Sequence, residues 1–296
     1  MRLRAMAKIN LGLDVLGERP DGYHEVRMVM QTISVYDVLE LKKRKESGIT
    51  LETNLPYIPT DRRNLVYRAA ELLMQEKGVT DGLSVSLKKV IPVAAGLAGG
   101  SADAAAAMVG VNRLFGLGFS REELMERAVR IGADVPYCIM QGTALAEGIG
   151  EKLKRLPPMP DCYVLIGKPK VSVSTKMAYE TLDFEHVKER PDIDRMIEAL
   201  ERKDIRRMAG YMENVFEPGI TGKYPVIREI RTVMEQCGAV RAMMSGSGPT
   251  VFGLFDDRKR MNKAASRLRR SSLCRTIRMA GIYNPGEQTY VESTDK

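Results

Sequence analysis

The segment from Pro92 to Ala105 constrains the fold most, because it links a strand-like run to an alanine-rich helix through a loop of small residues. Residues 83–90 show the alternation and β-branching of a strand, and helical spacing extends from Ser101 to Leu114. The pattern therefore predicts a strand, a small-residue loop and a helix in succession, with Ser101 as the helix N-cap.

A loop of this kind can bind an anion. Backbone N–H groups at a helix start point toward the ligand, glycine permits close approach, and the helix dipole adds attraction for phosphate oxygens. The segment lacks the Gly-Lys-Ser/Thr of a P-loop and the GxGxxG spacing of a dinucleotide fold. A triphosphate site and a plain tight turn against a packed helix both remain open on the pattern alone.

The order of the other elements predicts an α+β protein of two domains. Its 296 residues are about two domains' worth, and strands mix with helices without strict βαβ alternation. The proline cluster at 156–160 is the best candidate linker, so we expect domains at 1–158 and 159–296. Strand runs are expected at 26–35, 38–41, 143–153, 163–166, 240–244 and 250–255, and helices at 61–77, 193–200 and 226–236. A capping box formed by Ser120 and Glu123 predicts one further helix.

The composition indicates a soluble protein of the reduced cytoplasm. Hydrophobic residues make up 44% and charged residues 28%, which excludes collagen, long disorder and a coiled coil. The four cysteines contain no CxxC pair, so neither a zinc ribbon nor a disulfide framework is expected. Lys8, Asn10 and Asp14 interrupt any signal peptide, and Asp103 interrupts the window 90–111, so no membrane partner is expected.

The net charge of +8 is concentrated partly between Arg258 and Arg278, in a stretch without aromatic residues. On a helix such a cluster is more often a solvated face than a nucleic-acid footprint, so nucleic acid is not an expected partner. A basic chain also attracts phosphorylated small molecules, which fits the loop at 92–102.

Three further segments carry polar residues suited to chemistry. Lys8 and Asn10 project from one face of a strand, either as site residues or as a solvated face. Asp134, in Gly-Ala-Asp-Val-Pro, is either a helix cap or a carboxylate that, beside Lys8, could orient or deprotonate an alcohol. Tyr23 and His24 could hold a planar base or decorate a hairpin, and residues 245–250 form either a plain loop or a second set of amides facing an anion.

Together these segments resemble the GHMP kinases, the superfamily of galactokinase, homoserine kinase, mevalonate kinase and phosphomevalonate kinase. The resemblance covers residues 7–24, 91–105, 132–137 and 245–253, in the order of that family. It is closest to the members that phosphorylate the 2-hydroxyl of a cytidine-diphosphate-linked methylerythritol in the non-mevalonate isoprenoid pathway. It implies an S5-like N-terminal domain and a ferredoxin-like C-terminal domain, with the active site in the cleft between them.

The resemblance also implies a role for each matching residue. Asp134 corresponds to the catalytic base and Lys8 to the catalytic lysine. Residues implied to contact the substrate are Asn10, Tyr23, His24, Ser172, Thr175 and Tyr179. Residues implied to bind ATP are Pro92, Val93, Ala94, Ala95, Gly96, Leu97, Ala98, Gly99, Gly100, Ser101 and Ala102.

Magnesium is the second cofactor that the resemblance implies, with Ser101 and Glu123 as candidate ligands. Glu123 lies 11 residues before Asp134, where the superfamily often has a magnesium-binding Glu, but it is also the capping-box residue. Many members have glycine where this chain has Ala98, so Ala98 must adopt a φ that alanine tolerates.

Two alternatives remain beside this hypothesis. One is another GHMP kinase of the mevalonate or homoserine type, whose acyclic substrate would leave Tyr23 and Tyr179 nothing to stack on. The other is an S5-like nucleic-acid-binding protein that uses the basic stretch 258–278. The expected partner is a small-molecule substrate, and the expected state is a monomer or weak homodimer.

Overall fold

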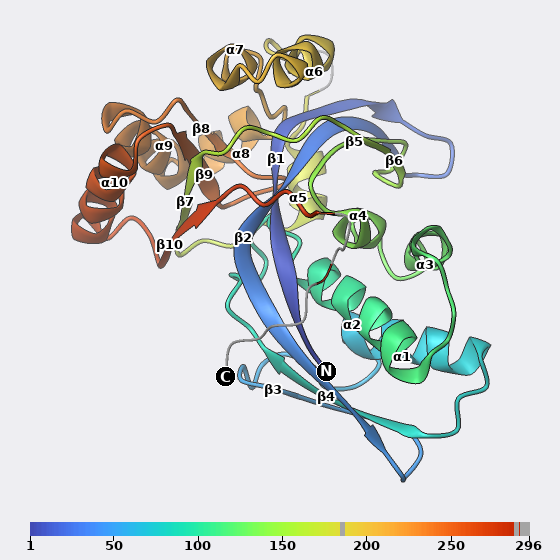
Figure 1. The fold of residues 1–296 in the computed structure, drawn as a ribbon. Helices are drawn as coiled ribbons and strands as arrows, with labels where there is room; N and C mark the ends of the chain where they lie inside the picture. Colours follow the sequence, from blue (N-terminus) through green and yellow to red (C-terminus); the bar gives the residue numbers. More distant parts are fainter. Residues whose placement is uncertain (184–186, 287–289, 291–296) are drawn as a thin grey trace.

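The computed structural model describes residues 1–183, 187–286 and 290, and two β-sheets come from consecutive parts of the chain (Figure 1). The described part of the first half forms a six-stranded sheet in the order β3-β4-β2-β5-β6, with β1 paired to β2. Its strands are β1 (Arg2–Glu18), β2 (His24–Arg44), β3 (Ile49–Thr53), β4 (Gly82–Lys88), β5 (Thr143–Glu147) and β6 (Lys152–Arg155). Its helices are α1 (Leu65–Glu76), α2 (Gly99–Phe115), α3 (Arg121–Ala128) and α4 (Val135–Met140).

Strands β1 and β2 form one long antiparallel pair of 17 and 21 residues. The two runs expected at 26–35 and 38–41 are joined in β2, so the sequence interpretation was wrong in dividing them. Shifts in register between Met6 and Lys8 and between Asn10 and Gly12 interrupt the pairing without ending the strands. Such irregularities bend and twist a ribbon, which lets a long pair curve around helices instead of breaking.

Helix α2 begins two residues earlier than expected, so the assignment of Ser101 as its N-cap is wrong. Ala98 occupies the N-cap position with φ 53°, and its side chain makes no capping bond. Its carbonyl accepts from the N–H of Ala102 at 2.8 Å. The left-handed residue turns the backbone directly into the helix, so no hydroxyl is required there.

The alanine-rich face of α2 packs against β1 and β2 and against α1. Ala102 and residues 104–107 are fully buried, and such small side chains let the helix lie close to the strands.

The capping box of α3 is confirmed, with Ser120 and Glu123 each bonded to the other's backbone N–H. Helix α1 begins at Leu65 and not at Asp61, as was expected, because Asn64 is its N-cap and accepts the backbone N–H of Val66.

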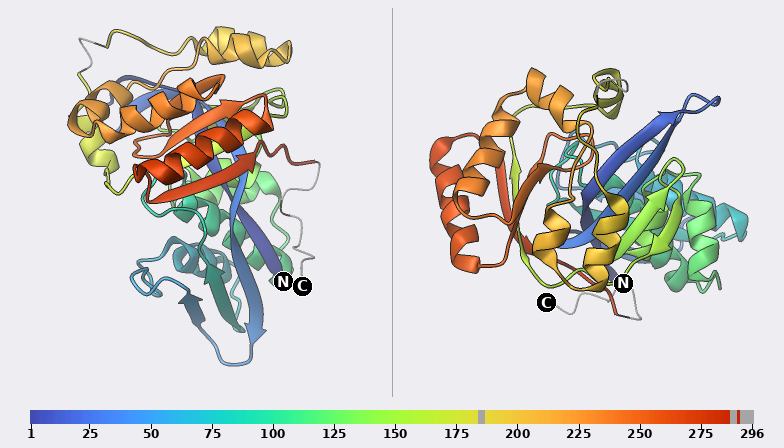
Figure 2. Two further views of the ribbon diagram at one scale, coloured as in Figure 1. Left: turned by 90° about the vertical axis from the view of Figure 1, so that its left-hand side faces the viewer. Right: turned by 90° about the horizontal axis from the view of Figure 1, so that it is seen from above.

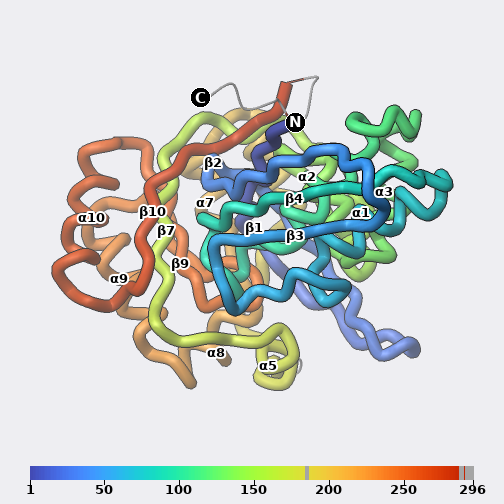
Figure 3. The backbone as a smooth tube through the Cα atoms, turned by 90° about the horizontal axis from the view of Figure 1, so that it is seen from below, coloured from blue at the N-terminus to red at the C-terminus, as the bar shows by residue number. Residues whose placement is uncertain are grey.

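The second half forms a four-stranded antiparallel sheet in the order β10-β7-β9-β8, with α9 and α10 packed against its strands (Figure 2). Seen from below, its strands run across those of the first sheet (Figure 3). The strands are β7 (Tyr163–Lys168), β8 (Arg241–Met244), β9 (Val251–Phe255) and β10 (Thr276–Gly281). The helices are α5 (Thr175–Glu180), α6 (Ile193–Glu201), α7 (Ile205–Ala209), α8 (Glu217–Lys223), α9 (Val226–Gln236) and α10 (Arg258–Ser271).

The expected boundary after residue 158 falls between β6 and β7, but the chain later returns to the first half. Tyr283 donates its backbone N–H to the carbonyl of Thr32 at 3.0 Å, and the Tyr290 hydroxyl donates to the carbonyl of Cys138 at 2.7 Å. The division at 158 and 159 therefore stays a prediction.

Asn214 connects the two halves from a fully enclosed position, with 2% of its surface exposed. The backbone on either side of it exchanges hydrogen bonds of 2.9 and 3.1 Å with Leu13 of β1. Its side-chain amide donates to the carbonyls of Met244 and Gly246, both at 2.8 Å, and its oxygen accepts from the N–H of Phe216. The backbone beside Asn214 and its side chain thus together join β1 to the loop that follows β8.

Replacing Asn214 tests this connection. Asn214→Ala leaves two buried carbonyls unpaired and should lower the free energy of unfolding by about 1 to 3 kcal/mol. Asn214→Asp should be worse, because it sets a carboxylate against the same two carbonyl oxygens. Urea unfolding at neutral pH measures both. An Asp variant at least as stable as the Ala variant would contradict the proposed donor role.

Candidate active site

A cavity of about 900 Å³ lies between the two halves, and both halves supply its walls. The first half contributes side chains of β1 and β2, the loop after β4 and Asp134. The second half contributes residues 173–175, Tyr179 and 246–248. The expected cleft site is therefore present as a space that can hold two small molecules.

The loop between β4 and α2 lines this cavity and is fixed from two sides. The carbonyl of Leu97 accepts from the backbone N–H of Lys8 at 3.2 Å, and the carbonyl of Gly96 accepts from the Ser245 hydroxyl at 2.9 Å. Ala94, Gly96 and Ala98 have positive φ of 48°, 72° and 53°. This path leaves the loop and the start of α2 facing the cavity, as an anion site requires.

Lys8 and Asn10 are buried, so the solvated-face interpretation of this part of β1 is wrong. Their exposed fractions are 5% and 0%, although both line the cavity. The Lys8 ammonium donates to the Asn10 oxygen at 2.8 Å, and the Asn10 amide contacts the Met28 sulfur at 3.1 Å. The register shifts of β1 on either side turn this polar pair inward beneath the loop.

Asp134 completes an ionic pair with Lys8. It stands at the N-cap position of α4, as the helix-cap interpretation expected, but its side chain makes no capping bond and is left to face Lys8. Its carboxylate lies 3.6 Å from the Lys8 ammonium and is 32% exposed, whereas the Lys8 side chain is 6% exposed. A half-buried carboxylate beside a buried cation can accept a proton from an alcohol that enters the cavity.

The aromatic residues expected to contact the substrate include one pair that stacks on itself. The His24 ring stacks on Tyr179 with centroids 4.1 Å apart and planes at 23°, while Tyr23 lines the cavity with 60% of its surface exposed. Phe216 meets Tyr179 at 83°. Burial, and to a smaller extent Asp134, raises the pKa of Tyr179, so its hydroxyl stays protonated at neutral pH.

Of the two implied substrate contacts in the segment before α5, Thr175 lines the cavity but Ser172 does not. Val173 and Ser174 line it as well, and Ser174 also caps α5. The loop after β8 joins the site, because residues 246–248 face the same space.

Leu97 and Ala102 of the expected ATP segment lie behind the cavity and are buried, whereas the other nine residues of that segment line it.

Of the two candidate metal ligands, only one lines the cavity. Ser101 lines the cavity, but Glu123 does not, because its carboxylate accepts from the Ser120 N–H at 2.7 Å in the capping box. The described residues contain no group of three His, Cys, Asp or Glu side chains arranged for a metal.

Sequence reasoning missed one wall of the cavity. Residues 57–59, 63–65 and Leu87 line it beside the loop after β4, together with Lys89 and Asp103. The stretch before α1 contains Tyr57 and Pro59 within a loop, and this was the only signal that it forms part of a site. It matches no motif, and folding alone brings it beside the glycine loop.

Fold and cavity together define a kinase that uses ATP to phosphorylate a small molecule. Residues 64–142 match the family described as GHMP kinases N terminal domain, and residues 196–272 match GHMP kinases C terminal. A crystal structure of homoserine kinase from Cytophaga hutchinsonii has the same fold, with TM-score 0.77 and 19% identity over 96% of this chain and 94% of that one.

More similar relatives narrow the assignment. The 4-diphosphocytidyl-2-C-methyl-D-erythritol kinase of Lachnospira eligens is 52% identical over 285 residues, which cover 96% of this chain and 99% of that protein. A crystal structure of 4-(cytidine 5'-diphospho)-2C-methyl-D-erythritol kinase has TM-score 0.83 and 32% identity over 96% of this chain and 100% of that one. The chain therefore belongs to the GHMP kinases, in the branch of the 4-diphosphocytidyl-2-C-methyl-D-erythritol kinases.

Within the described residues, every helix is too short or too polar to cross a lipid bilayer.

Gly96 in the loop and Gly100 in the first turn of α2 should respond differently to substitution. A Cβ at Gly96 would lie 2.1 Å from the Ser245 carbonyl oxygen, whereas one at Gly100 would meet nothing closer than 3.7 Å. With its positive φ as well, Gly96→Ala should lower the free energy of unfolding by about 2 kcal/mol or more. Gly100→Ala should stay within about 1 kcal/mol of the parent, because alanine favours a helix. Urea unfolding of both measures this, and equal losses would contradict the close approach of the two loops.

Proposed function

We propose that this GHMP kinase transfers the γ-phosphate of ATP to the 2-hydroxyl of 4-diphosphocytidyl-2-C-methyl-D-erythritol, with Asp134 as the base and Lys8 beside it. The observation that carries the proposal is one cavity lined by the loop after β4, the Lys8–Asp134 pair and Tyr179. Relatives that are 52% and 51% identical bear the name of this kinase, which supports the same substrate here.

In the proposed reaction the substrate hydroxyl oxygen attacks the γ-phosphorus, and the bond from phosphorus to the oxygen of ADP breaks. Asp134 orients the hydroxyl and accepts its proton, while Lys8 offsets the charge that develops on the phosphoryl oxygens. Asn10 holds the Lys8 ammonium at 2.8 Å, which fixes the cation before the ligands arrive. Transition states of this kind are often loose, so positioning and charge supply most of the rate.

We assign the triphosphate to the loop residues 92–102 and the adenine to the wall that sequence reasoning missed. The loop amides and the positive end of α2 favour the phosphates. With the reacting phosphate near Lys8, the nucleoside extends away from Tyr179 toward Tyr57, Pro59 and Leu65, which offer an apolar surface.

The cytidine end of the substrate is assigned to Tyr179, Tyr23 and His24. A pyrimidine ring stacks well on a tyrosine, and an imidazole N–H or nitrogen can read the edge of the base. Since His24 occupies one face of Tyr179, we propose that the base replaces it there and that His24 moves to the edge of the base. Thr175, Val173 and Ser174 line the path toward Asp134.

Magnesium fits this site as an ion held chiefly by the phosphates of ATP. Mg²⁺ at nucleotide sites typically takes one or two protein oxygens besides phosphate and water, and it neutralises charge during transfer. Ser101 supplies such an oxygen at the cavity wall, whereas the fixed capping role of Glu123 argues against it as a ligand. We therefore retain Ser101 as the candidate.

The setting of the enzyme is part of the same proposal. Free thiols at Cys138, Cys162, Cys237 and Cys274 support a reducing cytoplasm. The basic residues of α10 lie mostly on its exposed face, which supports the solvated-face interpretation over nucleic-acid binding. A monomer or weak homodimer remains the expected state.

Asp134→Asn should keep both ligands bound but lower kcat about 100-fold or more, because the amide retains the size and loses the base. A coupled assay that follows ADP release from ATP and the cytidine substrate gives kcat and both KM values. Mevalonate and homoserine serve as comparison substrates with the parent enzyme. Activity within threefold of the parent would exclude Asp134 as the base.

Tyr179→Ala should raise KM for the cytidine substrate about 5- to 30-fold, since a base stack contributes roughly 1 to 2 kcal/mol. The KM for ATP should hardly change, because ATP lies at the other end of the cavity. Tyr163 is an exposed tyrosine at the start of β7, and Tyr163→Ala is the matched control. A higher KM for ATP with an unchanged KM for the cytidine substrate would show that Tyr179 does not belong to the cytidine site.

A further inference from the structure

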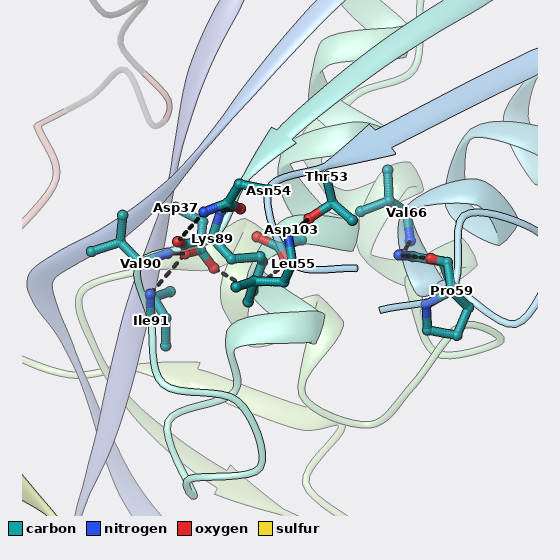
Figure 4. A network of polar contacts seen from close by, with 11 residues as sticks. Asp37, Thr53, Asn54, Leu55, Pro59, Val66, Lys89, Val90, Ile91 and Asp103 are labelled. Atoms are coloured by element: carbon teal, nitrogen blue, oxygen red, sulfur yellow. Dashed lines mark hydrogen bonds and ion pairs between the residues drawn. The ribbon is translucent and has the colours of Figure 1, made fainter. Parts of the chain in front are cut away.

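A buried ionic cluster lies at the base of the loop between β4 and α2, and two of its members, Lys89 and Asp103, also line the cavity (Figure 4). It consists of Asp37 on β2, Lys89 just after β4 and Asp103 in the second turn of α2, with exposed fractions of 0%, 8% and 2%. No step of the proposed reaction uses these residues. Ionic groups this deeply buried require an explanation, because removing them from water is unfavourable.

The cluster connects the two ends of the loop. The Lys89 ammonium bonds the Asp103 carboxylate at 2.5 Å and also bonds the Asp37 carboxylate. The other oxygen of Asp37 accepts the backbone N–H groups of Val90 and Ile91, the latter at 2.8 Å. Asp37 thus fixes the residues that enter the loop, and Asp103 belongs to the helix into which the loop leads.

Asn54 strengthens the entrance to the loop from a third element. Its side-chain oxygen accepts the backbone N–H of Lys89 at 2.7 Å, and its amide donates to the Lys89 carbonyl at 3.2 Å. The backbone of Lys89 is therefore fixed by Asn54 while its side chain reaches back to α2. Side-chain contacts from three elements to the start of one loop indicate that the position of the loop matters.

The backbone conformation of the loop between these two ends explains why the loop needs such contacts. Ala94 and Ala98 have positive φ of 48° and 53°, a left-handed region that disfavours alanine. Backbone strain of this kind persists only where the surroundings over-determine it. Fixed ends supply that constraint, and they keep the amides of the loop aimed into the cavity.

The charge balance argues against a role in stability alone. Two carboxylates face one ammonium, and one oxygen of Asp103 is buried without a hydrogen-bond partner among the described residues. Burial, followed by nearby Asp37, raises the pKa of Asp103 despite Lys89. Apolar residues of similar volume often replace such groups with no loss of stability.

We infer that Lys89 and Asp103 are positioning residues of the nucleotide site, which fix the loop at 90–98 between β2 and α2 so that its amides fit the phosphates of ATP. The inference rests on the proposed assignment of this loop to ATP. It requires that loss of the Lys89–Asp103 contact weaken nucleotide binding without unfolding the protein.

Asp103→Ala is the sharpest test, because it leaves Lys89 paired with Asp37 and puts alanine into an alanine-rich helix. The Kd for a fluorescent ATP analogue, measured without the second substrate, should rise about tenfold, the loss expected for one charge-assisted contact. The melting temperature should be unchanged or higher, and KM for the cytidine substrate should stay within twofold. Asp103→Asn, which keeps an oxygen for Lys89, should recover most of the nucleotide affinity.

Asp81→Ala, an exposed carboxylate just before β4, is the matched control and should change none of these values. Nucleotide affinity equal to the parent in Asp103→Ala would overturn the inference. A lower melting temperature with equal losses for both ligands would overturn it too, by indicating a fold defect. Because nucleotide binding is measured without turnover, a parent enzyme inactive on the cytidine substrate would refute the proposed function without affecting this test.

Discussion

The close contact between the loop after β4 and the loop after β8 is the constraint on which the site depends. Gly96 leaves no room for a side chain, because a Cβ there would lie 2.1 Å from the Ser245 carbonyl oxygen. The Ser245 hydroxyl bonds the Gly96 carbonyl, and Asn214 holds the second loop to β1 through the Gly246 carbonyl. The loop after β4 is therefore fixed by the other half of the chain. A nucleotide bound there, as we propose, would lie at the junction, where a second ligand can reach its terminal phosphate.

The same junction explains why polar residues of a long strand are buried. Lys8 donates its backbone N–H to Leu97 and its ammonium to Asn10, so β1 supports the loop and supplies a cation beneath it. Burial of a lysine is tolerated only with partners, and Asp134 at 3.6 Å is the second one. The ionic pair is thereby preorganised, so little reorganisation is required when charge develops during phosphoryl transfer.

The sequence predicted local features well where the cause was local. The capping box at Ser120 and the helix at 226–236 depend on residues a few positions apart, and both are present as expected. The burial of Lys8, the single long β2 and the start of α2 at Gly99 depend on contacts between segments far apart in the chain. Periodicity carries no information on such contacts. The wall at 57–65 was missed for the same reason, since only folding brings it beside the loop. The order of the four motifs, by contrast, indicated the family correctly, because each motif is local in the sequence.

The stack of His24 on Tyr179 bears on how the site separates its substrate from other alcohols. A ligand that enters the cavity and displaces His24 breaks an aromatic contact worth about 0.5 to 1.5 kcal/mol. In the site as we propose it, a cytosine ring restores that contact on the same face of Tyr179 and gives His24 an edge to bond. Mevalonate and homoserine have no aromatic ring, so neither can replace His24 on Tyr179. Such a ligand either leaves the stack of His24 on Tyr179 intact and does not contact the aromatic surface, or breaks the stack and gains no aromatic contact in return. Under the proposed function, selectivity can thus arise from the contact between His24 and Tyr179, which only a base-bearing substrate can replace.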